Sequence, residues 1–409
     1  MSDRVLPESD DELRAQVVDW LRATLPPEWI AAIDADDKPA LRIARERLDT
    51  RDWWERLGEA GWYFSNWPIE YGGLGLDPVR ASVVNRALGE YKVPRTDNPL
   101  GINVAQALLQ WGTEDQRRRF LPEIAHQRET WVQLFSEPGA GSDLAGLATR
   151  AVRDGDTWII NGQKVWSSHA ERSQWGILLA RTDPDVPKHH GISVFLLDMS
   201  RPGIDVRPLR QMTGEAFFNE VFLDDVECPD RQRLGGIGEG WSIASQLLTF
   251  ERGAGGSSGS SKPSMGIGRS VDALCTHYRP VVDPMLRARL AQAYIRDRVG
   301  QWTRLRADAQ RKAGRDAARA SIILKLFSTE TAQALQTLSL DLEGVNGVAA
   351  DPDDRWAATS VYGFLRTRSA TISGGSSEIQ RNIIAEKVLG LPRDPAVDVG
   401  VPWRDVLRS

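Results

Sequence analysis

The first third of the chain carries apolar residues at helical spacing between clear start and stop signals. A helix is predicted to begin at the capping box Ser9-Asp-Asp-Glu12 and to end before Pro26-Pro27. Its apolar face consists of Leu13, Val17, Val18, Leu21 and Leu25. Gly112-Thr-Glu-Asp115 has the form of another helix start, and Trp67–Gly75 is typical of a loop between helices. We therefore expect an N-terminal helical domain over residues 1–129.

Between residues 130 and 235 the pattern changes to short apolar runs rich in β-branched and aromatic residues. The expected strands are Thr149–Arg153, Thr157–Ile160, Gln163–Trp166, Trp175–Arg181, Gly191–Asp198 and Glu220–Val226. Asp154-Gly-Asp156 and Asn161-Gly162 separate the first three runs and are typical of hairpin turns. Short strands divided by turns predict a small β-barrel or sandwich domain.

Helical spacing returns after residue 236. Asp283-Pro284 combines a cap with proline at the first helical position. Two apolar stripes follow, Ile295, Val299 and Trp302 in the first and Leu335, Leu338 and Leu342 in the second, which ends at Gly344. Because such stripes usually form a core, we expect both to be buried. The predicted fold is therefore α+β and multidomain, with a C-terminal helical bundle over residues 236–409.

Composition narrows the class of protein. The 409 residues include 51 Lys and Arg against 56 Asp and Glu, a net charge of −5, which argues against nucleic acid or an anionic membrane as the main partner. Arg117-Arg118-Arg119 is the most compact basic cluster, and we interpret it as a solvated helix face. The sequence shows neither a signal-peptide core nor an apolar run of membrane-spanning length.

The cysteines and histidines give no pattern of metal ligands. Cys228 and Cys275 lack both metal-ligand spacing and a disulfide framework, and the five histidines are scattered apart from His189-His190. We therefore expect no metal site and a location in the reducing cytoplasm.

Two segments of the middle region carry the candidate chemistry. Glu137-Pro-Gly-Ala-Gly141 forms a rigid turn whose glycines let the backbone approach a flat ligand, and Ser142 and Asp143 add polar groups at its edge. Some twenty residues on, Trp166 offers an aromatic face and Ser168 a hydroxyl. A glycine-rich turn alone is most often only a turn. The two segments together indicate a seat for a planar conjugated cofactor.

These segments resemble the flavin-binding middle domain of the acyl-CoA dehydrogenases. The resemblance extends over nearly the whole chain through Trp67–Gly75, Gly112–Gln116, Met212-Thr-Gly214 leading to Val226, and Ser373-Gly-Gly-Ser-Ser-Glu-Ile-Gln-Arg-Asn-Ile-Ile384. It implies FAD as the cofactor, an acyl-CoA thioester as the substrate and an electron-transfer flavoprotein as the electron acceptor.

The resemblance also implies roles for individual residues. Phe135, Ser136, Trp166 and Ser168 match positions that line the flavin ring, Ser376 and Glu378 match contacts to its sugar and phosphate region, and Ser142 and Arg252 match positions that meet the substrate.

Catalysis in this family needs a carboxylate base beside the thioester carbonyl. Most members carry it in the C-terminal signature, where this chain has Gly374, a residue that keeps only a backbone N–H to donate to the carbonyl. A minority carry the base on the helix that opens the C-terminal domain, and Glu251 falls on that position. An ordinary surface Glu-Arg pair with Arg252 is the alternative. The vacant position favours Glu251 as the base.

Two departures from the family pattern concern assembly. The Arg-x-x-Phe-Gly segment that reaches a neighbouring subunit's flavin is missing between Gly268 and Asp283, and Asp341 stands where glutamine is common. The pattern resembles bacterial members that act on steroid side chains, in which two different chains share a reduced number of flavins. A homo-oligomer and a heteromer with a sister chain both remain open.

The low-complexity stretch Gly253–Gly268 has two interpretations. Its composition favours a flexible linker. Its small side chains would also widen the pocket for a bulky or branched acyl group, such as a steroid side chain. Two alternatives to a catalytic dehydrogenase remain, namely a non-catalytic or half-site subunit of a heteromer and a flavin oxidase or monooxygenase on the same fold.

Overall fold

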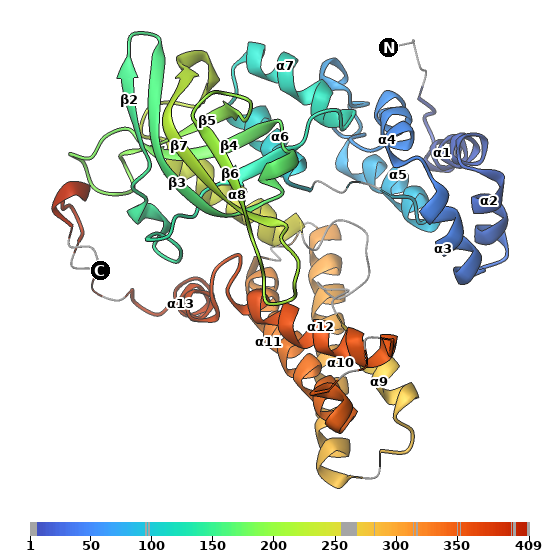
Figure 1. Ribbon diagram of the computed structural model, residues 1–409. Helices are drawn as coiled ribbons and strands as arrows, with labels where there is room; N and C mark the ends of the chain where they lie inside the picture. The colour runs from blue at the N-terminus through green and yellow to red at the C-terminus, as the bar shows by residue number, and fades with distance from the viewer. Residues whose placement is uncertain are drawn as a thin grey trace.

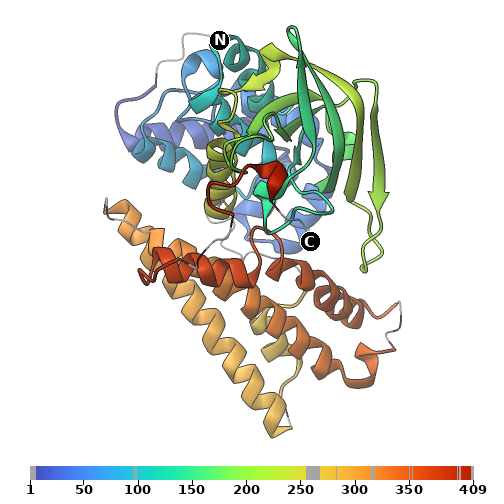
Figure 2. The same ribbon diagram turned by 90° about the vertical axis from the view of Figure 1, so that its left-hand side faces the viewer.

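The computed structural model describes residues 6–94, 96, 99–254, 268–281, 283–313, 315, 318–349, 351, 353–393, 395 and 398–406. A β-sheet domain adjoins a helical domain formed by the N-terminal part of the chain, and a helical bundle projects from the two (Figures 1 and 2). The predicted order of helices, β-domain and helices is therefore confirmed, and with it the α+β multidomain fold.

The N-terminal domain is entirely helical apart from its loops. Its helices are α1 (Asp10–Thr24), α2 (Pro27–Asp34), α3 (Lys38–Arg47), α4 (Thr50–Glu59), α5 (Pro78–Glu90), α6 (Pro99–Trp111) and α7 (Glu114–Ala125). Ser9 caps α1, since its Oγ accepts from the N–H of Glu12 at 3.2 Å. Thr113 and Gln116 form a reciprocal capping box at the start of α7. Both predicted helix starts are confirmed.

The middle domain contains one eight-stranded sheet. Its strands are β1 (Trp131–Leu134), β2 (Arg150–Asp154), β3 (Thr157–Ser168), β4 (Trp175–Arg181), β5 (Ile192–Asp198), β6 (Ile204–Leu209), β7 (Phe218–Pro229) and β8 (Arg233–Leu234). Seven follow the order β6-β7-β3-β2-β4-β5-β8, and β1 pairs in parallel with β4. Strands β1, β6 and β8 were not predicted, although Ile204-Asp-Val-Arg207 in β6 alternates after the turn residues Pro202-Gly203.

The prediction of a hairpin at Asn161-Gly162 was wrong. Strand β3 runs through both residues and pairs with β7 on either side, with a shift of register between Ile160 and Gly162. The Asn161 amide donates to the Asp225 carboxylate at 2.9 Å, so the residue bridges two strands. A Cβ on Gly162 would lie 2.4 Å from Oγ1 of Thr149. The dipeptide therefore forms a bulge where a neighbouring strand approaches closely.

The chain after the middle domain is helical, and its helices after α8 form the bundle. The helices of this part are α8 (Gly240–Ala254), α9 (Val271–His277), α10 (Pro284–Lys312), α11 (Ala318–Glu343), α12 (Arg355–Thr367) and α13 (Ser377–Lys387). Asp283 caps α10 through its Oδ1, which accepts from the N–H of Met285 at 2.7 Å. Leu338 is buried, and α11 is followed by Gly344 with a φ of 58°. The cap and the second stripe are as predicted, whereas residues 255–267 of the Gly/Ser stretch lie outside the described residues.

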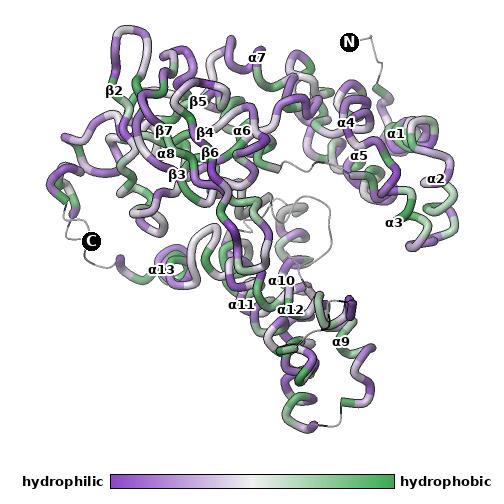
Figure 3. Tube along the Cα trace, viewed as in Figure 1, coloured by the Kyte–Doolittle hydropathy of each residue, from purple (hydrophilic) through white to green (hydrophobic). Residues whose placement is uncertain are grey.

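The first stripe, on α10, is not buried within the single chain. Ile295 is 54% exposed, Val299 40% and Trp302 65%, so the expectation of a core face was wrong. The helix packs against α11 and buries Leu290 and Ala307 instead. Figure 3 shows hydrophobic positions recurring along α10 between hydrophilic ones. Periodicity identifies an apolar face, but it does not identify what covers that face.

Within the described part of the chain, no helix is long and apolar enough to cross a membrane. The same residues contain no cluster of three or more His, Cys, Asp or Glu side chains arranged to hold a metal ion.

Candidate active site

A buried ion pair joins the two segments that carry the candidate chemistry. Nζ of Lys164 on β3 lies 2.7 Å from Oε1 of Glu137, which opens the glycine-rich turn after β1. Lys164 is fully buried and Glu137 is 8% exposed. The same ammonium donates to the carbonyl of Phe135 at 3.1 Å, and the N–H of Val165 donates to the carbonyl of Ser136 at 2.9 Å. Phe135 and Ser136 are thereby held beside the end of β3.

Glu137 is also bonded by the chain that leaves the turn. Its carboxylate accepts from the N–H of Ala148 at 2.6 Å and from the N–H of Thr149 at 2.9 Å. Burial alone would raise the pKa of Glu137, but the charge of Lys164 and the surrounding hydrogen bonds hold it below its usual value. Burial lowers the pKa of Lys164 to about 8. A buried pair with several additional hydrogen bonds fixes the turn at both ends.

The pairing of Lys164 with Glu137 was not predicted from the sequence. One signal pointed to it: the alternation along β3 places Trp158, Ile160 and, after the bulge, Lys164 on the buried side. A charged residue on a buried face requires an opposite charge nearby. The sequence did not identify which carboxylate supplies that charge.

Trp166 projects from the sheet as an exposed aromatic surface. Strand β3 shifts register between Lys164 and Ser167, and Trp166 within this shift has a φ of 61° and is 61% exposed. Ser167 is buried, whereas Ser168 is exposed. The irregular backbone therefore turns a large indole outward, a strained arrangement of the kind that clusters at functional sites.

The indole lies at the boundary between the β-domain and the bundle. Its ring meets that of Phe218 edge-on, with the ring centroids 5.8 Å apart, and the centroids of Phe218 and Phe217 lie 4.5 Å apart. The guanidinium of Arg366, on α12, lies 5.2 Å from the Phe217 ring. A chain of ring contacts thus connects Trp166 to the bundle.

The glycine-rich turn presents polar groups and open backbone to solvent. Ser142 is exposed, and a Cβ on Gly139 or Gly141 would have no neighbour within 4 Å. Packing within the chain therefore does not require glycine at either position. An approaching ligand would use that space.

The C-terminal signature forms a tight turn before α13. Gly374 and Gly375 have φ values of 65° and 93°. The carbonyl of Gly374 accepts from Nε2 of Gln380 at 3.1 Å, and that of Gly375 accepts from Nζ of Lys325 at 2.5 Å. Two polar side chains thus hold this left-handed segment in place.

Ser376 and Glu378 begin α13. Ser376 is its N-cap, accepting from the N–H of Ile379 at 3.4 Å, and a backbone N–H together with Ser376 lowers the pKa of the Glu378 carboxyl. Among the described residues, no hydrogen bond, ion pair or ring contact joins Gly374, Ser376 or Glu378 to the middle-domain candidates. Of the candidates, the structure brings Phe135 and Ser136 to the end of β3 that carries Trp166 and Ser168.

Glu251 and Arg252 lie in the last turn of α8, and their side chains lie outside what the structure describes. The helix itself packs against α6 and β5, and Nε1 of Trp111 donates to Oε1 of Gln246 at 2.7 Å. The backbone of both residues is thus placed on α8, and the proposed role of the Glu251 carboxylate rests on its position in the sequence.

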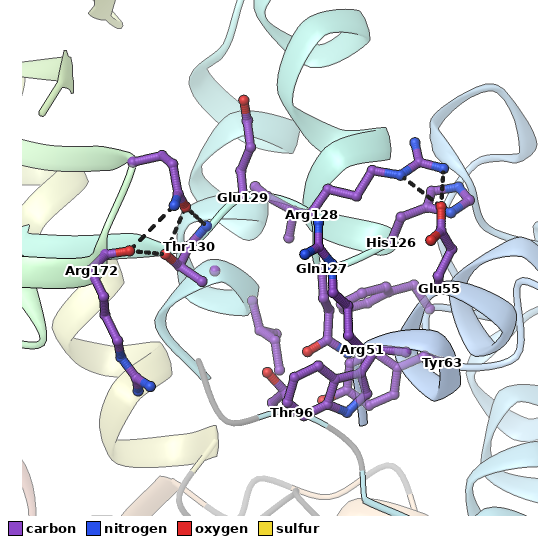
Figure 4. A pocket seen from close by; sticks show the side chains of 16 residues that line it. Arg51, Glu55, Tyr63, Thr96, His126, Gln127, Arg128, Glu129, Thr130 and Arg172 are labelled. Atoms are coloured by element: carbon purple, nitrogen blue, oxygen red, sulfur yellow. Dashed lines mark hydrogen bonds and ion pairs between the residues drawn. The ribbon is translucent and has the colours of Figure 1, made fainter. Parts of the chain in front are cut away.

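A pocket of about 400 Å³ lies elsewhere, where the helical domain meets the β-domain. Arg51 and Glu55 on α4 lie across it from Thr130 and Arg172, and Arg128 pairs with Glu55 at 2.9 Å (Figure 4). None of the candidate site residues lines this pocket. We therefore assign it to the domain junction and not to the candidate site.

Family models of known proteins match almost the entire chain. The N-terminal, middle and C-terminal domain models of the acyl-CoA dehydrogenases match residues 7–128, 133–226 and 238–389. Acyl-CoA dehydrogenase IpdE1 of Mycobacterium tuberculosis is 39% identical over 404 residues, which cover 94% of this chain and 98% of the relative.

Solved structures show the same likeness. The ChsE4-ChsE5 complex from Mycobacterium tuberculosis is 28% identical with a TM-score of 0.70, covering 96% of this chain and 100% of the matched chain. The Tcur3481-Tcur3483 steroid ACAD is 26% identical with a TM-score of 0.71 and the same coverage.

Proposed function

The chain belongs to the acyl-CoA dehydrogenase family, and on that premise we propose that it oxidises an acyl-CoA thioester to the 2-enoyl-CoA with FAD as cofactor. One observation carries the proposal. The buried pair of Lys164 and Glu137 holds the Phe135-Ser136 segment beside the exposed indole of Trp166. Phe135 is buried there, and the half-buried Ser136 next to an exposed aromatic surface suits a flat, conjugated ring.

Residues on two domains are proposed to hold the cofactor. Phe135, Ser136, Trp166 and Ser168 would line the flavin ring. Ser376 and Glu378, at the N-terminus of α13, would contact its sugar and phosphate region, where helical N–H groups favour phosphate oxygens. When bound, the flavin supplies the oxidant that accepts the hydride from the β-carbon of the substrate.

The remaining chemistry falls to the chain's own groups. Glu251 is proposed to remove the proton next to the thioester carbonyl, and the backbone N–H of Gly374 to donate to that carbonyl as negative charge develops on it. Gly374 has a left-handed φ of 65°, which disfavours a side chain at this position. Ser142 and Arg252 are proposed to contact the substrate.

We propose a bulky or branched acyl group, of the steroid side-chain kind, as the substrate. One matched solved structure is described as a steroid acyl-CoA dehydrogenase. The Gly/Ser stretch from Gly253 to Gly268 begins two residues after Glu251, so small side chains would leave room close to the proposed base.

The proposed assembly is a heteromer with a sister dehydrogenase chain. Arg269, the first arginine after the Gly/Ser stretch, has its guanidinium 3.6 Å from the ring of Trp356 and donates to the Trp356 carbonyl at 3.0 Å. Asp341 pairs with Arg289 at 2.6 Å. Both side chains are thus engaged within their own bundle, Arg269 in the region where the family segment is missing and Asp341 at the position where glutamine is common.

The exposed stripe of α10 would supply the contact surface between subunits. A homo-oligomer is the alternative, and one matched structure is a complex of two named components.

Electrons are proposed to pass to an electron-transfer flavoprotein. The two free cysteines fit a reducing cytoplasm. The domain boundaries at residues 129/130 and 235/236 remain predictions.

The visible spectrum tests the proposed function. The chain is purified alone and after co-expression with a neighbouring dehydrogenase gene, and steroid-type and straight-chain CoA esters are added anaerobically. We expect loss of the oxidised flavin band with the bulky esters and formation of the enoyl product. A flavin-loaded complex that no CoA ester reduces would overturn the proposal.

A further inference from the structure

The C-terminal segment Asp398–Val406 returns to the middle domain and lies along the loop between β4 and β5. Pro402 forms a β-bridge with Pro187, the N–H of Trp403 donates to the carbonyl of Val186 at 2.9 Å, and the N–H of Arg404 donates to that of Pro184 at 3.1 Å. This segment, red in Figures 1 and 2, lies against the β-domain in both views. We refer to it as the C-terminal strap.

The strap contacts the residues that follow the glycine-rich turn. Nε1 of Trp403 donates to the carbonyl of Gly146 at 3.2 Å, across 257 residues of sequence. The Trp403 ring also lies 4.6 Å from the guanidinium of Arg181. Arg181 in turn donates to the carbonyls of Ala145 and Leu147 at 2.6 and 3.2 Å. Trp403 and Arg181 together therefore bind three consecutive carbonyls that follow the turn.

The strap reaches the exposed side of the turn through one lysine. Nζ of Lys188 donates to both carboxylate oxygens of Asp143 at 3.0 Å and pairs with Asp398 of the strap at 2.7 Å. Lys188 is only 17% exposed, so both bonds are partly shielded from solvent. Asp143 directly follows Ser142 in the sequence. The strap is thus linked to Asp143 through Lys188 and to Gly146 through Trp403, two residues that follow Ser142. We refer to residues 139–148 as the Ser142 turn.

We propose that the C-terminal strap positions the Ser142 turn for the CoA thioester, with Trp403 and Lys188 as the positioning residues. This inference rests on the proposed function, in which Ser142 contacts the substrate. The Lys164–Glu137 pair holds the two ends of this segment, whereas Gly139 and Gly141 between them have open space around them, so the exposed residues between the two ends depend on further contacts to keep their conformation. Anchoring them removes conformational freedom that substrate binding would otherwise have to remove.

Loss of the contacts between the strap and the Ser142 turn should weaken binding of the CoA ester in its ground state and in its transition state alike. KM then rises while kcat holds, because no interaction specific to the transition state is removed. Trp403→Ala and deletion of residues 398–409 should each raise KM for the CoA ester about tenfold, with kcat and FAD content within about twofold of the parent. Trp403→Phe keeps a ring near Arg181 but removes the donor to Gly146, so its KM should lie between that of the parent and that of Trp403→Ala.

Arg404→Ala is the matched control within the strap. Its side chain pairs with Asp185 at 2.8 Å, both groups are largely exposed, and the pair does not reach the turn. We expect parent values of KM and kcat for this variant.

A second measurement does not depend on turnover. Amide hydrogen exchange is followed for peptides that cover residues 139–148 in the flavin-loaded protein. Exchange in the turn should rise in Trp403→Ala and in the deletion variant but not in Arg404→Ala. Unchanged exchange in both variants overturns the inference, as does faster exchange with an unchanged KM. Absence of turnover with every ester in the parent protein would count against the proposed function, and the exchange result would still decide whether the strap holds the turn.

Discussion

Lys164 and Glu137 lie 27 residues apart in the sequence and form an ion pair of 2.7 Å in which both side chains are buried. Because Lys164 also binds the carbonyl of Phe135, the pair fixes the path of the chain between β1 and the glycine-rich turn. Two positions farther along β3, Trp166 projects outward. The pair therefore has a structural role that a surface ion pair would not have, and its removal should be costly.

Lys164→Met should destabilise the protein by about 3–5 kcal/mol, because it leaves the Glu137 carboxylate buried without its counter-charge. Urea denaturation followed by circular dichroism measures the change. The double variant Lys164→Met/Glu137→Gln provides the control and should recover part of the loss, since it leaves no buried charge. Additive losses in the double variant would show that the two residues do not act as a pair.

Lowering the pH should remove the contribution of the Glu137 carboxylate to the stability of the fold. Its pKa in the folded protein lies below the usual 4.5, so the unfolded state binds more protons in the interval between the two values. The stabilising contribution is therefore complete above pH 4.5 and is lost as the pH falls through the folded pKa. Glu137→Gln should show a shallower fall of unfolding free energy below pH 4.5 than the parent. Equal slopes for the two proteins would contradict this assignment.

Glu251→Gln should lower turnover by at least about 10²-fold while the fold and FAD content stay as in the parent, because it removes the proposed general base. Stopped-flow reduction of the flavin by the CoA ester measures the chemical step directly. Glu90→Gln is a suitable control, since Glu90 is paired with Arg14 in the N-terminal domain. Parent turnover in Glu251→Gln would remove the assignment of the base.

Trp166→Ala should weaken FAD retention without unfolding the protein, because an exposed indole contributes little to the core. Flavin released on gel filtration, quantified by absorbance, measures the effect. Val152→Ala on the same sheet is the control, since Val152 is 55% exposed but belongs to no candidate segment. Equal flavin retention in both variants would exclude Trp166 from the cofactor site.

The chain expressed alone should hold FAD weakly or below one flavin per chain, and a sister chain should restore it, because the arginine that would pair with the flavin pyrophosphate across an interface is missing. Trp302→Glu on α10 should also weaken assembly with the sister chain. Flavin content and mass by light scattering check both expectations. A homo-oligomer with one tightly bound FAD per chain and full activity would refute this prediction and leave the dehydrogenase function intact.

Local chemistry was sufficient to predict most of the secondary structure. The helix starts at Ser9–Glu12, Gly112–Asp115 and Asp283-Pro284 were identified because a helix start depends on residues within a few positions of itself. Strands β4 and β5 were predicted because their apolar runs are long and bounded by turn residues. The family resemblance, and with it the order of the three domains, also rested on short contiguous motifs.

Tertiary structure decided the features that depend on partners distant in sequence. Asn161-Gly162 forms a bulge and not a turn because Asp225 and Thr149 lie next to it in space. Glu137 is the carboxylate that neutralises Lys164, and Trp403 reaches Gly146 from the other end of the chain. The apolar stripe of α10 stays exposed because covering it requires a surface that the single described chain does not provide. A sequence pattern states which groups need a partner, whereas only the folded chain brings a particular partner within reach.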